Sequence, residues 1–170
     1  LPTAPQPTTW QRMGEDVLWN GFAFTMTDVN GGYVNRGIGL NASDPNPTTD
    51  VPLFDNKSFT YDGTIDTINI GSTPLDLRFN RLDTFSFSAW VKIDTTQQNV
   101  ILSNQLAPST NYRGYYFAVQ SNKLTAIFRS TLSDRLIFNG ATNLTSGWNH
   151  VVFTYDGSAT TSGGQLYING

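Results

Sequence analysis

The sequence predicts an all-β fold, an antiparallel β-sandwich. Apolar and polar residues alternate along 85–92 and again along 150–155, the period of two expected of a strand with one face on a core. Nowhere do apolar residues recur at the i, i+3, i+4 and i+7 spacing of an amphipathic helix over three turns. The residues predicted to face the core are Phe85, Phe87, Ala89, Val91, Val151, Phe153 and Tyr155.

Residues 1–52 are predicted to form a proline-rich arm with one strand. Three prolines fall within the first ten residues and favour an extended backbone: Pro2, Pro5 and Pro7. Alternating apolar residues within 17–29 predict the strand, and 30–32 supplies its Asn-Gly-Gly turn. The three prolines within 44–52 predict a loop.

Residues 53–170 are predicted to form the sandwich domain. One strand covers 85–92. Residues 115–120 and 124–128 flank a short polar connection and predict a hairpin. A strand over 150–155 ends at Asp156-Gly157, a tight-turn signal, and a further hairpin leads to 164–169.

Four segments, in this order and at this spacing, resemble the laminin-G-like, concanavalin A-type jelly roll. They are SFTYDGTIDTINIG (58–71), FSFSAWVK (85–92), GWNHVVFTYDG (147–157) and GQLYING (164–170). The resemblance covers 54–170 and implies a jelly-roll sandwich that binds glycans or protein surfaces. Family members continue beyond the LYING segment into further strands, so we expect strands after Gly170, or another chain, to complete the sheet.

The amino-acid composition limits the partners, the source and the location that we expect for the chain. Only 14% of the 170 residues are charged, the net charge is −3, and the ten Lys and Arg are scattered, which argues against nucleic acid as a partner. No apolar run approaches the about 20 residues of a spanning helix, and no signal peptide is visible. The absence of Cys indicates a bacterial or phage source, and we expect an extracellular or virion location.

The sequence lacks the residues that most kinds of catalytic site need. Glu15 is the only Glu, so the paired-Glu pattern of bacterial glucanases of this fold is excluded, while a glycosidase using two Asp residues stays open. His150 is the only His, and no nucleophile elbow, zinc ligand set or phosphate-binding loop occurs. We therefore predict that the chain is not an enzyme, and that His150 and Trp148 serve the fold.

Calcium is the metal that oxygen-rich loops of this kind bind. The resemblance implies that Asp62 and Asp66, in the YDGTID segment, lie where family members often place a calcium-associated acidic residue. The alternative interpretation is a turn at Asp62-Gly63, with the Asp side chain bonded to its own backbone. Other ligands of the family come from strands that would follow residue 170.

Aromatic and basic residues near a glycine are the candidates for contact with a glycan or a protein. Tyr112, Arg113, Tyr115 and Tyr116 fall at a predicted junction of loop and strand, and Tyr and Arg are frequent interface anchors. The alternative is that Tyr115 or Tyr116 packs inward by alternation. Trp90 lies opposite the predicted inner face, so it is either a surface contact or covered by an N-terminal loop.

Three functions are consistent with these features. The leading hypothesis is a non-catalytic interaction module in a phage virion or another extracellular assembly, in contact with neighbouring chains. The second is a secreted bacterial carbohydrate-binding lectin module. The third is a glycoside hydrolase or lyase domain that depends on Asp. Jelly rolls host both binding and structural roles, so the fold alone does not separate the first two.

Overall fold

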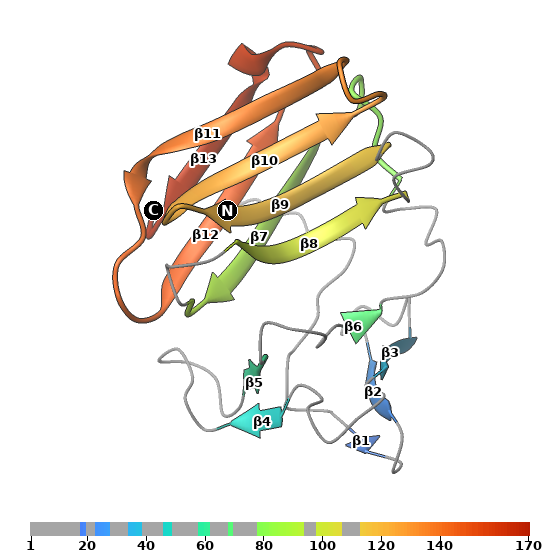
Figure 1. The fold of residues 1–170 in the computed structure, drawn as a ribbon, viewed down its shortest axis with the longest axis vertical. Helices are drawn as coiled ribbons and strands as arrows, with labels where there is room; N and C mark the ends of the chain where they lie inside the picture. Colours follow the sequence, from blue (N-terminus) through green and yellow to red (C-terminus); the bar gives the residue numbers. More distant parts are fainter. Residues whose placement is uncertain are drawn as a thin grey trace, which may run out of the picture. The chain divides into compact units, whose positions relative to one another are not determined.

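The computed structural model forms two compact units, residues 1–78 and 79–170 (Figure 1). Side chains are described for 58–61, 78–93, 98–106 and 113–170, and the backbone alone for 18–19, 23–27, 34–38, 46–48 and 68–69. The predicted proline-rich segment 1–10 lies outside the described residues. The predicted domain boundary after residue 52 stays a prediction.

The first unit contains short antiparallel strands. One sheet has the order β1 (Leu18–Trp19), β2 (Ala23–Thr27), β3 (Val34–Ile38) and β6 (Ile68–Asn69). The segment predicted as a single strand, 17–29, therefore provides two strands, which pair with each other.

A second sheet of this unit corrects the loop predicted over 44–52. Strand β4 (Asn46–Thr48) lies within that segment and pairs with β5 (Ser58–Thr60). Pro47 stands opposite Phe59 in this two-stranded ladder. A proline lacks the N–H of a central strand but is tolerated in an edge strand, and both strands of a two-stranded sheet are edges.

The second unit is a sandwich of two antiparallel sheets, which confirms the predicted fold class. One sheet has the order β11 (Arg135–Asn143), β10 (Lys123–Arg129), β9 (Gly114–Gln120) and β8 (Asn99–Gln105). The other has the order β13 (Gly164–Ile168), β12 (Asn149–Tyr155) and β7 (Phe85–Val91). A short 3-10 helix, η3 (Thr161–Gly163), precedes β13.

The predicted inner faces of β7 and β12 are confirmed. Val151 and Phe153 have no exposed surface and Tyr155 is 4% exposed, while the residues between them are half-buried. Phe87 stands opposite Phe153 in the ladder and packs against the same core. The register places apolar residues opposite one another across the sheet, as a half-buried sheet requires.

The two predicted hairpins of the sandwich form with the expected turn chemistry. Ser121 and Asn122 connect β9 to β10 with φ of 48° and 64°, the positive values of a two-residue type I′ turn. Gly157 follows β12 with φ of 76°, and a Cβ there would lie 2.7 Å from the carbonyl oxygen of Leu82. Glycine is required at this position by both conformation and space.

The core is a layer of aromatic rings between the two sheets. Phe153 of β12 lies 5.1 Å from Phe138 and 5.9 Å from Phe128 between ring centroids, both on the opposite sheet, and 6.5 Å from Phe87 on its own sheet. Such tilted and offset pairs are favourable beyond the area they bury. Phe153 therefore joins the two sheets.

We expect Phe153→Ala to lower the free energy of unfolding by about 3–5 kcal/mol, the range for truncating a buried Phe. Urea unfolding measures this change. Thr154→Ala, on the outer face of the same strand, is the matched control and should cost less than about 1 kcal/mol. An equal effect of the two substitutions would contradict the assignment of the strand faces.

Alkaline pH should destabilise the fold through Tyr115. Burial raises the pKa of its phenol to about 12, and a hydrogen bond with Asn104 offsets part of this rise. Because the unfolded phenol titrates near pH 10, the stabilising contribution is complete below about pH 10 and is lost as the pH rises through the folded pKa. We expect the free energy of unfolding to fall over that interval by roughly 1–2 kcal/mol.

Tyr115→Phe provides the control, since it removes the ionisable group and keeps the ring. Urea unfolding at several alkaline pH values should show a smaller pH slope for the variant than for the wild type. The same slope in both proteins would contradict the assignment to Tyr115.

Candidate functional site

The structure separates the residues predicted to contact a ligand. Strand alternation directs Tyr115 into the core, where it is 2% exposed, and Tyr116 to the opposite face of the sheet. The prediction of a surface contact is thus corrected for Tyr115, because its ring lies between the sheets. Arg113 is exposed just before β9, and Tyr112 lies outside the described residues.

Trp90 lies on the outer face of the three-stranded sheet and is 44% exposed. Coverage by an N-terminal loop, the alternative to a surface position, concerns residues outside the described ones and stays a prediction. Tyr167 of β13 is also 44% exposed. It stands opposite Val152, whose other neighbour in the sheet is Ser88. Two exposed rings thus flank the central strand on one face, and we call Trp90, Ser88, His150 and Tyr167 the aromatic platform.

His150 connects the parts of the aromatic platform. Its ring centroid lies 5.1 Å from that of Trp90, its partner in the ladder, with a tilt of 35° between the rings. Its Nε2 is 2.8 Å from the Ser88 Oγ, a hydrogen bond in which the tautomer decides the donor. These contacts hold the imidazole over the sheet and beside the indole.

Asn149 supports the platform from the buried side of the strand. It has no exposed surface, and its Nδ2 donates to the carbonyl oxygens of Thr145 and Gly147 at 2.9 Å each. Its Oδ1 accepts from the Thr145 hydroxyl at 2.9 Å and from the Asn169 Nδ2 at 3.3 Å. The start of β12 is thereby fixed to the preceding loop and to the end of β13.

Asn169 completes this connection on the outer side. Its Oδ1 accepts from the His150 N–H at 2.9 Å, and its own N–H donates to the His150 carbonyl oxygen at 2.8 Å. The φ of Asn169 is 59°, a left-handed conformation that Asn tolerates better than most residues. The backbone of His150 is therefore held in place by a residue that the LYING segment contributes.

The aromatic platform offers ring faces and hydrogen-bonding groups. The strands β7, β12 and β13 contain no Asp or Glu, and no carboxylate of the described residues is hydrogen-bonded to His150. A serine nucleophile requires a base that is itself oriented by a third group. Among the described side chains, no such third group is hydrogen-bonded to His150.

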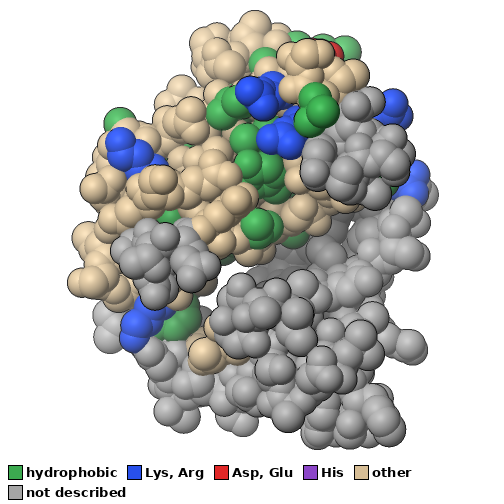
Figure 2. All heavy atoms as spheres, viewed as in Figure 1, with side chains coloured by type: hydrophobic (Ala, Val, Ile, Leu, Met, Phe, Trp, Pro, Cys, Tyr) green, Lys and Arg blue, Asp and Glu red, His purple; other side chains and the backbone are tan. Residues whose placement is uncertain are grey.

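The outer face of the four-stranded sheet has a different character. Tyr116, Ala118 and Ile127 form a small buried cluster there, with Ile137 packed against it. The Arg129 guanidinium lies 5.8 Å from the centre of the Tyr116 ring. Figure 2 looks onto this side and shows hydrophobic side chains in the middle of the sheet with Lys and Arg side chains beside them.

The predicted calcium site lies outside the described residues, because both Asp62 and Asp66 do. Among the described side chains, no three His, Cys, Asp or Glu residues come together as a metal site. Calcium binding therefore stays a prediction. Within the same part of the chain, no helix is long and apolar enough to cross a membrane.

Several residues on the two outer faces were not predicted from the sequence. Tyr167 was detectable, since Leu166 and Ile168 alternate with it and pack on the core. The contact of Ser88 with His150 was not, because it depends on the register between two strands 62 residues apart. The proximity of Arg129 and Arg135 likewise depends on the register of β10 and β11.

A comparison with protein families gives a match over most of the sandwich. The family model Laminin_G_3, described as the concanavalin A-like lectin/glucanases superfamily, matches residues 62–170. The curated proteins and the solved structures that were compared contain no match. The match includes all seven strands of the second unit.

We expect Asn149→Ala to lower the free energy of unfolding by about 2–4 kcal/mol, because it leaves several buried donors and acceptors without a partner. Urea unfolding measures the loss. Asn143→Ala, at an exposed position near the end of β11, is the matched control. Equal stability of the two variants would show that the Asn149 hydrogen bonds do not hold the start of β12.

Proposed function

This chain belongs to the concanavalin A-like lectin/glucanases superfamily, and on that premise we propose that it is a non-catalytic interaction module that binds glycans. The superfamily supports carbohydrate or protein binding as the general role. The choice of glycan rests on the chemistry of the aromatic platform, since one fold hosts many functions and the site must decide among them.

The observation that carries the proposal is the pair of exposed rings, Trp90 and Tyr167, on the two strands that flank β12. A sugar ring has an apolar face that stacks on an aromatic side chain and hydroxyl groups that need donors and acceptors around it. Ser88 and His150 supply such groups beside the Trp90 ring. The three strands carry no charged side chain, so the platform suits an uncharged sugar.

A binding role without catalysis is supported by the position of the acidic residues. Glycoside hydrolysis uses two carboxyl groups about 5–10 Å apart on either side of the scissile bond. The acidic residues with described side chains are Asp83, Asp134 and Asp156, and all three lie between strands. None of the seven strands of the sandwich contributes a carboxylate to either sheet face.

We further propose that the module works outside the cell, as a component of a phage virion or another extracellular assembly. The absence of Cys and the low charged fraction of 14% support this setting. Antibody labelling of intact particles and of culture supernatant tests it. Detection only inside cells would contradict it.

We expect the wild-type protein to bind neutral glycans on an array and Trp90→Ala to bind at least about tenfold more weakly, since central aromatic anchors contribute about 2 kcal/mol or more. Tyr167→Ala should weaken binding to the same glycans. Val100→Ala, an exposed apolar residue on the other sheet, is the matched control and should bind as the wild type does.

Two outcomes would contradict the proposal. Binding that survives both Trp90→Ala and Tyr167→Ala would show that the platform is not the glycan site. Release of reducing ends from a polysaccharide by the purified wild-type protein would show that the module is catalytic.

A further inference from the structure

Three leucine side chains of the sandwich are exposed to solvent. Leu82 is 74% exposed, and Leu106 and Leu132 are each 50% exposed. The other leucines with described side chains are buried or half-buried. A single exposed apolar residue is common on a protein surface, but several in one place indicate an interaction site.

The strand register places two of these leucines at the same end of the sandwich. One row of partners crosses the whole four-stranded sheet: Gln105, Gly114, Arg129 and Arg135. Leu106 follows this row directly at the end of β8, and Leu132 lies in the turn that connects β10 to β11. Both side chains therefore belong to the connections beyond one end of the sheet.

Leu82 belongs to the same end, although it precedes a strand of the other sheet. The Arg81 Nη2 lies 2.7 Å from the Asp134 Oδ1, which joins the turn before β7 to the turn that carries Leu132. The Tyr155 hydroxyl also donates to the Arg81 carbonyl oxygen at 2.7 Å. Figure 1 shows the start of β7, the end of β8 and the turn between β10 and β11 together. We call the turns 80–83 and 130–134, with Leu106 and Arg113, the loop end.

The two leucine turns bond many of their own polar groups. The Asn80 N–H donates to the Asp83 Oδ2 at 2.7 Å, and the Asp83 N–H donates to the Asn80 carbonyl oxygen at 3.1 Å. In the other turn, the Ser130 N–H donates to the Asp134 carbonyl oxygen at 3.0 Å, and the Asp134 N–H donates to the Thr131 hydroxyl at 2.9 Å. Backbone groups without a partner are costly where lipid replaces water, so such turns suit contact with a bilayer.

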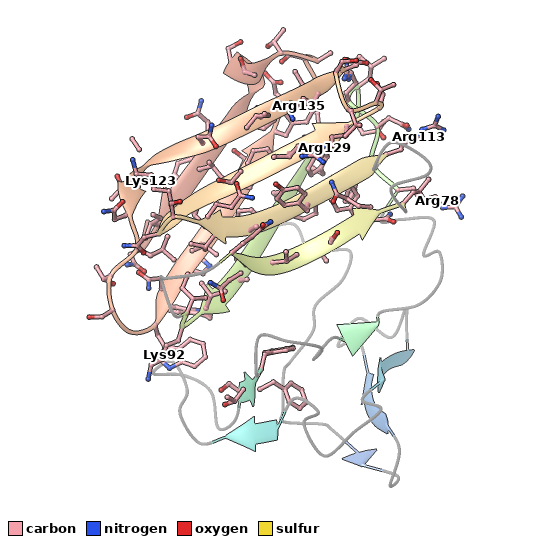
Figure 3. All side chains as sticks on the ribbon, in the orientation of Figure 1. Arg78, Lys92, Arg113, Lys123, Arg129 and Arg135 are labelled. Carbon is pink, nitrogen blue, oxygen red and sulfur yellow. The ribbon has the colours of Figure 1, made fainter. Side chains whose placement is uncertain are left out.

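Exposed arginines stand beside the leucines. Arg113 and Arg135 are both exposed. The Leu106 N–H donates to the Arg113 carbonyl oxygen at 2.8 Å, and Arg135 follows Leu132 by three residues. Figure 3 shows Arg113 and Arg135 at the loop end and Lys123 at the opposite end of the sheet. A guanidinium donates two parallel hydrogen bonds to a phosphate, so these arginines suit the headgroup region of a bilayer.

The carboxylates of this end are bonded within the protein. Arg81 pairs with Asp134, the Asp83 Oδ2 accepts from the Asn80 backbone and side chain, and the Asp156 Oδ1 accepts from the Ser158 N–H at 2.8 Å. The described residues at this end include four Arg and three Asp, in a chain whose net charge is −3. The loop end therefore has a small excess of positive charge.

We propose that the loop end binds the surface of an anionic phospholipid bilayer. Leu82, Leu106 and Leu132 enter the boundary between headgroups and acyl chains, and the exposed arginines contact the phosphates. Binding of this kind gains from buried apolar area and from attraction to anionic lipids together.

The placement of the leucines favours a bilayer over a protein partner. Anchors of protein interfaces cluster in well-packed pockets, whereas these leucines lie on three separate connections. The hollow along the edges of β11 and β13, lined by residues such as Phe138 and Leu166, includes none of the three. The aromatic platform lies on the face of β7, β12 and β13, so the inference stands independently of the proposed function.

Co-sedimentation of the full chain with lipid vesicles tests the inference. The probes are vesicles of phosphatidylcholine mixed with an equal amount of phosphatidylglycerol, and vesicles of phosphatidylcholine alone. We expect binding to the mixed vesicles and weaker binding to the neutral ones. Added salt should weaken binding to the mixed vesicles without abolishing it, because burial of leucine does not depend on charge.

The decisive variant is Leu82→Ala/Leu132→Ala, which should bind the mixed vesicles about tenfold or more weakly, because two leucine side chains lose most of their apolar burial. Both side chains are exposed, so the fold should tolerate the change. Val100→Ala truncates an exposed apolar residue of β8 away from the loop end and should bind as the wild type does.

The arginines are tested separately from the leucines. Arg113→Ala/Arg135→Ala should remove the preference for phosphatidylglycerol. Lys92→Ala/Lys123→Ala removes the same charge at the opposite end of the sandwich and should keep that preference (Figure 3).

A fluorescent label reports insertion directly. The chain has no Cys, so Leu132→Cys provides a single thiol for an environment-sensitive fluorophore. Its emission should shift to the blue on addition of mixed vesicles. The same label on Val100→Cys should not shift.

The inference is overturned if the mixed vesicles do not bind, if Leu82→Ala/Leu132→Ala binds them as tightly as the wild type, or if the labels at both positions shift equally. Self-association that the leucine variant abolishes, without any binding to vesicles, would assign the loop end to a second copy of the chain instead. Trp90→Ala should retain vesicle binding even where it loses neutral glycans, which separates the two surfaces.

Discussion

The arrangement of this sandwich depends on a single aromatic layer between its two sheets. Phe153 contacts rings from both sheets, and the ladder places it opposite Phe87 on its own sheet. A shift of one residue would move every inner side chain to the outside, so this packing sets the register of the strands. The outer residues follow the same register. Because Phe87 pairs with Phe153, Trp90 pairs with His150 in the same ladder.

Buried polar groups hold the strand ends that the aromatic layer does not reach. The Tyr155 hydroxyl donates to the carbonyl oxygen of Arg81 and accepts from the Ala159 N–H, both at 2.7 Å. It joins the segment before β7 to the loop after β12. Asn149 acts similarly at the other end of β12. Because unpaired buried groups are costly, such residues specify loop positions that apolar packing leaves open.

Much of the sandwich follows from the sequence, and the exceptions have physical causes. The alternation around Phe87 and Phe153 identified two strands and their inner faces. Strand β8 was missed because its register shifts between Val100 and Leu102, which breaks the period of two. Alternation also decides that neighbours such as Tyr115 and Tyr116 face opposite sides of the sheet, but only the packed structure decides which one joins the main core. Contacts between strands, including Arg129 with Arg135, depend on pairing that local patterns do not contain.

One apolar layer gives this unit two outer faces with different chemistry. The face of β7, β12 and β13 is uncharged and presents aromatic rings, whereas the strands of the other sheet carry only positive charge. Each face is built from the alternate positions of strands whose other positions form the core. On the outer face of the four-stranded sheet, the Arg129 guanidinium lies over the Tyr116 ring, so a charged group there packs on an aromatic one.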